Sequence, residues 1–177
     1  MRQVVHQEQI KTVLAELAKR CKGPGRVYVV GGTTAVLSGW RDSTVDIDMK
    51  IGPEPKGIFE AIRDLKNELQ VNIELASPDD FMPALPGWED RSQFIFETKG
   101  VTFYHYDFYA QALSKILRAH KRDSEDVQSM LDNNLVTPAE LNRLFLTIEP
   151  NLIRYPSIDP ADFKKKVEAI VGRISSI

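Results

Sequence analysis

The chain has 177 residues, of which 42% are hydrophobic and 27% are charged, a balance typical of one soluble globular domain or of a core with a small helical extension. Its formal net charge of −2 gives no overall electrostatic reason to bind nucleic acid, and its single cysteine excludes an internal disulfide. No apolar run is long enough to span a membrane, and residues 1–14 lack the apolar stretch of a signal peptide, so we expect a cytoplasmic protein.

The first part of the chain predicts alternating helices and strands. Their expected ranges, from hydrophobic periodicity and from Gly and Pro breakers, are a helix at 4–21, a strand at 26–30, a short helix at 33–38 that ends at Gly39, a strand at 44–51, a helix at 56–69 and a strand at 71–75. In the last of these strands, Ile73 and Leu75 are expected to point inward, and Asn72 and Glu74 outward.

A loop and a hairpin follow, and the rest of the chain is helical. The loop covers residues 77–91 and the hairpin strands cover 92–97 and 101–106; helices are expected at 107–121, at 124–132, from Thr137 and from Asp159. Thr137 and Glu140 fit a capping box, and Asp123 fits the N-cap of its helix. We therefore expect an α/β (α+β) fold, with a core at residues 1–106 and a helical region at 107–177 packed on it.

Two glycines, Gly31 and Gly32, stand between a predicted strand and a predicted helix. Glycine lets the backbone come close to a ligand, and a helix N-terminus presents unpaired N–H groups with a partial positive charge. The pair therefore favours a phosphate site, to which the Thr33 hydroxyl can add a donor. A tight turn without a ligand is the alternative.

Asp46 and Asp48 are two residues apart on the strand at 44–51, so both carboxylates leave the same face. Neighbouring carboxylates repel each other unless a cation lies between them. Because these are hard oxygen ligands with no histidine or cysteine cluster nearby, Mg²⁺ or Mn²⁺ is the expected metal. The alternative is the solvated polar face of an amphipathic strand.

The segment "VVGGTTAVLSGWRDSTVDIDM", the loop "ELASPDDFMPALPGWEDR" and the helical "YDFYAQALSKILRAHKRDSEDVQSML" together resemble the nucleotidyltransferase superfamily related to DNA polymerase beta. The likeness is greatest to small bacterial proteins related to the nucleotidyltransferases of toxin–antitoxin systems, and it covers residues 26–132. It implies a mixed sheet flanked by helices, Mg²⁺ at Asp46 and Asp48, and a nucleoside triphosphate over the two glycines. A nucleotidyl group would pass to a hydroxyl acceptor.

The resemblance also implies a third catalytic carboxylate and a cationic contact to the triphosphate. Glu74 is the candidate carboxylate, although the superfamily more often has aspartate there, and an ordinary surface carboxylate is the alternative. Lys115 and Arg122 are seven residues apart and so share one face of a continuous helix, where they are candidates for nucleotide binding. Their alternative is a solvated helix flank.

The interpretation that follows is a Mg²⁺-dependent nucleotidyltransferase acting on an unidentified acceptor, which could be a tRNA end, a protein hydroxyl or a small molecule. From the resemblance alone we expect a toxin-like role with an antitoxin partner. Two rival interpretations remain open. One is a catalytically inactive nucleotide sensor or protein-interaction module with the same fold, and the other is an antitoxin-like binding protein that needs no metal.

Overall fold

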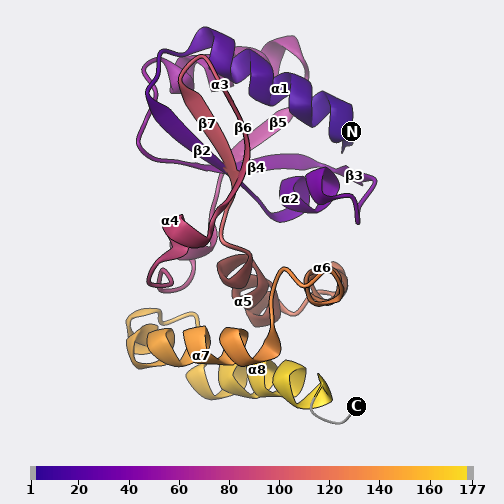
Figure 1. The fold of residues 1–177 in the computed structure, drawn as a ribbon, viewed down its shortest axis with the longest axis vertical. Helices are drawn as coiled ribbons and strands as arrows, with labels where there is room; N and C mark the ends of the chain where they lie inside the picture. The colour runs from indigo at the N-terminus through magenta and orange to yellow at the C-terminus, as the bar shows by residue number, and fades with distance from the viewer. Residues whose placement is uncertain (1–2, 175–177) are drawn as a thin grey trace. The chain divides into compact units, whose positions relative to one another are not determined.

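A computed structural model describes residues 3–174 and divides the chain into two compact units (Figure 1). Met1–Ser77 and Ser92–Tyr106 make up the first, which we call the sheet unit. Pro78–Arg91 and Asp107–Ile177 make up the second, which we call the helical unit. Residues 78–91 thus belong with the helices that follow the hairpin, although they precede it in the sequence.

The sheet unit contains a five-stranded mixed sheet in the order β5-β4-β2-β7-β6. Its elements are β1 (Val5–His6), α1 (Gln7–Arg20), β2 (Gly25–Val30), α2 (Gly31–Ser38), β3 (Ser43–Thr44), β4 (Asp46–Ile51), α3 (Ile58–Glu68), β5 (Asn72–Leu75), β6 (Gln93–Thr98) and β7 (Val101–His105). β4 pairs with β5 and β2 with β7 in parallel, whereas β2 with β4 and β6 with β7 are antiparallel. The predicted mixed sheet flanked by helices is confirmed.

One face of this sheet forms the hydrophobic core against α1 and α3. Leu14 and Leu17 of α1 and Leu65 of α3 are fully buried in it, together with Ile47 and Met49 of β4. Because side chains alternate along a strand, Asp46 and Asp48 point to the face opposite Ile47 and Met49. The core therefore fixes the face on which the polar side chains of β4 lie.

Two expectations about the sheet unit are wrong in detail. The first helix starts at Gln7 rather than at residue 4, because Val5 and His6 extend as β1 and pair with β3. Leu75 is 52% exposed instead of buried, whereas Ile73 two residues earlier is buried as expected. Leu75 is the last residue of β5, which is an edge strand. A side chain there can lie on the core face of the sheet and still be exposed to solvent.

The helical unit contains helices and two short 3-10 segments. Its elements are η1 (Pro78–Asp80), α4 (Trp88–Arg91), α5 (Phe108–Arg118), α6 (Lys121–Asp132), α7 (Pro138–Ile148), η2 (Glu149–Arg154) and α8 (Pro160–Ile174). Its core includes Leu113 of α5 and an edge-to-face contact between Phe145 and Phe163, whose ring centroids are 5.0 Å apart. None of the helices in residues 3–174 has both the length and the apolar character of a membrane span.

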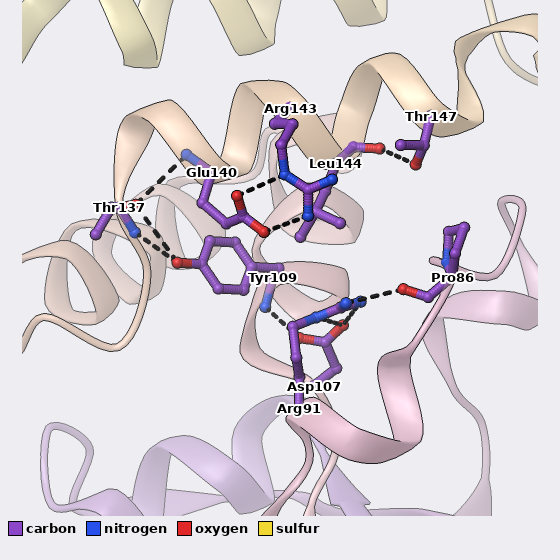
Figure 2. A network of polar contacts seen from close by, with 9 residues as sticks. All are labelled: Pro86, Arg91, Asp107, Tyr109, Thr137, Glu140, Arg143, Leu144 and Thr147. Carbon is purple, nitrogen blue, oxygen red and sulfur yellow. Dashed lines mark hydrogen bonds and ion pairs between the residues drawn. The ribbon is translucent and has the colours of Figure 1, made fainter.

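A buried ion pair holds residues 86–91 against the start of α5 (Figure 2). Arg91 donates to Asp107 Oδ2 from Nε at 3.0 Å and from Nη2 at 2.7 Å, and its Nη1 donates to the Pro86 carbonyl. Asp107 is fully buried and also accepts from the backbone N–H of Tyr109 as the N-cap of α5. Burial raises the pKa of Asp107, against the opposing effect of Arg91.

The predicted capping box at α7 forms only in part. Thr137 accepts from the backbone N–H of Glu140, as expected of an N-cap. The Glu140 carboxylate, however, binds Arg143, and the Thr137 N–H donates to the hydroxyl oxygen of Tyr109 at 3.1 Å (Figure 2). A tertiary partner on α5 has therefore replaced the local one.

Candidate active site

Strand register brings the three candidate carboxylates of the sheet unit onto one face. Across the parallel pair β4–β5, Asp46 lies opposite Asn72 and Asp48 lies opposite Glu74. All four side chains point away from the face that contains Ile47, because paired residues of neighbouring strands share a face. Asp46 and Asp48 are half-buried and Glu74 is exposed.

Asn72 links two of these carboxylates. Its amide nitrogen Nδ2 donates to Asp46 Oδ1 at 2.6 Å and to Glu74 Oε1 at 2.7 Å. One neutral side chain thus supplies donors to two like charges, which orients both without neutralising them. The sequence places Asn72 on the polar face beside Glu74, but a single strand carries no sign of this contact, which depends on the register with β4.

Gly31 brings the strand–helix turn against Asp48. It is the first residue of α2, directly after β2, and its φ of +60° lies in the left-handed region that favours glycine. A Cβ atom at this position would lie 3.1 Å from Asp48 Oδ2. The backbone of the turn and the second aspartate are therefore in close proximity, as a shared phosphate and metal site requires.

Gly32 is required for packing. A Cβ atom there would lie 2.4 Å from Thr44 Oγ1 and 3.2 Å from Arg41 Nη1. The absence of a side chain lets the guanidinium of Arg41 approach the backbone of the turn. A cation next to an N-terminal helix turn adds to the positive potential that phosphate oxygens prefer.

Thr33 joins α2 to β4. Its hydroxyl, fully buried, accepts from the backbone N–H of Asp48 at 3.0 Å and donates to the backbone carbonyl of Asp46 at 3.4 Å. These bonds fix the start of α2 against the strand that carries both aspartates. The predicted contact of Thr33 with nucleotide stays a prediction.

His105, at the end of β7, is a neutral structural residue. Its Nδ1 lies 3.4 Å from the hydroxyl of Thr34, which donates to the Val29 carbonyl. Burial lowers the pKa of His105 to about 4. The imidazole is therefore uncharged near neutral pH.

The donor chemistry at Asp46 and Asp48 fits a small hard cation. Within residues 3–174, no group of three or more His, Cys, Asp or Glu side chains is arranged to hold a metal ion. Magnesium is usually bound in proteins by one or two carboxylates, with substrate phosphates and water completing its coordination. Two carboxylates beside a glycine turn suited to phosphate meet that requirement.

The two predicted cationic contacts, Lys115 and Arg122, belong to the helical unit but lie on different helices. Helix α5 ends at Arg118 and α6 begins at Lys121, so the continuous helix on which they would share a face does not form. Lys115 is 3% exposed, and its Nζ lies 2.6 Å from Asp126 Oδ2 and 3.6 Å from Asp123 Oδ1. Arg122 is exposed near the start of α6. Nucleotide binding by either residue stays a prediction, and the present contacts of Lys115 join α5 to α6.

Asp123 is not the N-cap that the sequence predicts. Helix α6 begins earlier, at Lys121, with His120 in the N-cap position. Asp123 is buried in the first turn, where it accepts from Arg118 at 2.8 Å, and its Oδ2 has no hydrogen-bond partner among the described residues. Tertiary ion pairing has therefore overridden the local capping preference.

Comparison with known proteins gives one family. A family model described as "Nucleotidyltransferase of unknown function" (DUF6036) matches residues 7–167. No curated protein and no solved structure matches significantly. The matched range includes all eight candidate site residues, from Gly31 in the sheet unit to Arg122 in the helical unit.

Proposed function

The chain belongs to this family of nucleotidyltransferases of unknown function, and we propose that it transfers a nucleotidyl group from a nucleoside triphosphate to a hydroxyl acceptor. The observation that carries the proposal is the register of β4 with β5. It places Asp46, Asp48 and Glu74 on one face of two adjacent strands. The same face adjoins the turn at Gly31.

The turn at Gly31 and Gly32 binds the triphosphate in this proposal. Its support is the start of α2 at Gly31, the positive φ there and the approach of Arg41 to Gly32. Backbone N–H groups and a guanidinium can each donate to phosphate oxygens. Further contacts from Lys115 and Arg122 in the helical unit remain part of the proposal.

Asp46 and Asp48 would hold Mg²⁺, or Mn²⁺ in its place. When bound, the metal would stabilise negative charge on the entering and leaving oxygens. Asn72 would keep Asp46 in a fixed orientation, since its amide donates to Oδ1 of that carboxylate. Thr33 would do the same for the backbone of both aspartates.

Glu74 is the proposed general base. The acceptor oxygen forms a bond to the α-phosphorus, and the acceptor proton passes to the Glu74 carboxylate. The bond from the α-phosphorus to the bridging oxygen breaks, and pyrophosphate leaves with that electron pair. The exposure of Glu74 and its hydrogen bond to Asn72 support this role, because the carboxylate is both accessible and oriented.

Two further expectations rest on the sequence: a toxin-like role with an antitoxin partner, and a cytoplasmic location. They belong to the proposal, and neither is needed for the chemistry. A toxin-like role predicts that expression of the wild-type chain slows cell growth while the Asp46→Asn variant does not. Equal growth with the two chains would remove that role and leave the chemistry standing.

The experiment that tests the proposal measures the rate of Mg²⁺-dependent pyrophosphate release from each nucleoside triphosphate in the presence of total cell extract. Asp46→Asn should lower the rate by roughly a hundredfold or more, as for loss of a main electrostatic group in an active site. Asp64→Asn is the matched control, because Asp64 is a half-exposed carboxylate on α3 outside the site. Metal-dependent nucleotide binding without pyrophosphate release would favour the inactive sensor.

A further inference from the structure

A polar pocket adjoins the carboxylate face of the sheet unit. Its volume is about 500 Å³, within the range of about 300–1,000 Å³ that small-molecule sites occupy. Among the residues that the structure describes, its wall consists of Gln3 before β1, Val45 just before β4, Lys66 and Asn67 at the end of α3, Gln70 and Val71 in the connection to β5, and Asn72 and Glu74 of β5. Val45 and Val71 directly precede the two parallel strands, so the pocket lies at their amino ends.

Two pocket residues are shared with the proposed catalytic face. Glu74, the proposed base, is part of the wall, and so is Asn72. Asn72 Nδ2 lies 2.6 Å from Asp46 Oδ1, so one side chain contacts both the pocket and a proposed metal ligand. A molecule in this pocket would therefore contact the carboxylate to which the acceptor must give its proton.

The chemistry of the wall favours an uncharged ligand with several hydroxyl groups. Four of the eight described wall residues are carboxamides, which both donate and accept hydrogen bonds, as a hydroxyl group does. Among the described residues, Lys66 and Glu74 are the only charged ones that line it, and their charges cancel. Val45 and Val71 add apolar surface that suits the C–H groups of a ring.

A nucleic acid acceptor fits this wall poorly. Contacts to a phosphate backbone come from several lysine and arginine side chains, and Lys66 is the single cation among the wall residues within 3–174. Stacking of an unpaired base needs aromatic side chains, and the part of the wall that the structure describes has none. A small polar molecule needs neither feature.

We propose that this pocket binds the acceptor and that the acceptor is a small, uncharged, polyhydroxylated molecule of the sugar or cyclitol class. The inference rests on the proposed nucleotidyl transfer, and it adds the substrate class. In this proposal Gln70 binds a hydroxyl group of the acceptor. Its Nε2 donates to the Asn67 carbonyl at 2.7 Å, which orients the side chain at the end of α3 and leaves Oε1 as the acceptor that Gln70 can offer to a ligand hydroxyl.

The first test locates the transferred label. The full chain is incubated with α-labelled nucleoside triphosphate, Mg²⁺ and, separately, RNA, protein and the low-molecular-mass fraction of a cell extract, which ion exchange divides into anionic, cationic and neutral parts. We expect label in the neutral part alone. Label in RNA, in protein or in a charged small molecule overturns the pocket inference and leaves nucleotidyl transfer intact. Absence of Mg²⁺-dependent pyrophosphate release with every fraction overturns both.

The second test is the variant Gln70→Gly. Gln70 has a φ of +53°, a conformation that glycine adopts easily, so the change removes the side chain without adding backbone strain. It should raise the KM for the neutral fraction roughly threefold to tenfold, as for loss of one hydrogen bond, with the KM for nucleotide unchanged. A KM for the neutral fraction that equals the wild-type value would overturn the role of Gln70 and of the pocket.

Asn134→Gly is the matched control. Asn134 is also an exposed carboxamide with positive φ, at +55°, but it lies after α6 in the helical unit. It should leave both KM values unchanged. As a readout independent of turnover, the side-chain amide signals of Asn67, Gln70 and Asn72 in nitrogen-15 NMR spectra should shift when the neutral fraction is added. Signals that stay in place while label transfer proceeds would exclude this pocket as the acceptor site.

Discussion

Replacing Gly32 by alanine should destabilise the sheet unit, because the new Cβ atom has no space. It would lie 2.4 Å from Thr44 Oγ1 and 3.0 Å from Thr44 Cβ. Thr44 would have to move by about 1 Å to restore ordinary van der Waals contact. Its hydroxyl donates to the Asp46 carbonyl at 3.1 Å, so the movement also disturbs the strand that carries the two aspartates.

The expected magnitude combines two effects. Overpacking of this kind costs about 1–3 kcal/mol, and loss of the Thr44 hydrogen bond adds about 1 kcal/mol. Gly32→Ala should therefore lower the free energy of unfolding by roughly 2–4 kcal/mol, which a domain of ordinary stability survives. Equilibrium unfolding in urea measures the change. Gly172→Ala is the control, because a Cβ atom there meets nothing within 4 Å and alanine favours the helix.

A double-mutant cycle with Thr44→Ala identifies the cause. Thr44→Ala removes the hydroxyl that makes the shortest contact, so Gly32→Ala should cost about 1 kcal/mol less in that background than in the wild type. The reasoning fails if the two effects are additive. It also fails if Gly32→Ala leaves the free energy of unfolding unchanged.

Three further predictions concern buried ionisable groups. The free energy of unfolding should fall by about 3 kcal/mol as pH drops from about 6.5 to about 4, because the unfolded chain binds a proton at His105 that the folded chain excludes. Urea unfolding of His105→Gln should lose this part of the pH dependence. A pH profile of the variant that matches the wild type would contradict the prediction. Asp126→Asn should destabilise the helical unit by about 3 kcal/mol, since Lys115 would keep a buried charge without its 2.6 Å partner, and thermal unfolding that matches wild type would refute this. Arg91→Met should lower the free energy of unfolding by about 3 kcal/mol at neutral pH, because it leaves the buried charge of Asp107 unpaired. The loss should be smaller in acid, because burial raises the pKa of Asp107 and protonation removes the unpaired charge. Urea unfolding at the two pH values measures the difference, and equal losses would count against the prediction.

Periodicity made the polar face of β4 predictable. Ile47 and Met49 alternate with Asp46 and Asp48, so burial of the apolar pair in the core sets the direction of both carboxylates. The position of Gly31 between a strand and a helix was equally readable, since the apolar run at 26–30 predicts the strand that ends directly before it. These features depend on residues close together in the sequence.

Features that depend on contacts between distant segments could not be read in this way. The hydrogen bond from Asn72 to Asp46 needs the register of β4 with β5, which neither strand shows alone. The exposure of Leu75 follows from its place at the end of an edge strand. The described wall of the pocket beside Glu74 comes from three separate stretches of the chain, at Gln3, at Val45 and at residues 66–74, so no single stretch predicts it.

The most direct measurement of the central claim is a crystal structure of the full chain with Mg²⁺ and a non-hydrolysable nucleoside triphosphate analogue. Our account predicts one carboxylate oxygen from Asp46 and one from Asp48 at about 2.1 Å from the same metal ion, with the phosphates over Gly31 and Gly32. An analogue bound elsewhere, or a metal ion that contacts neither aspartate, would contradict it.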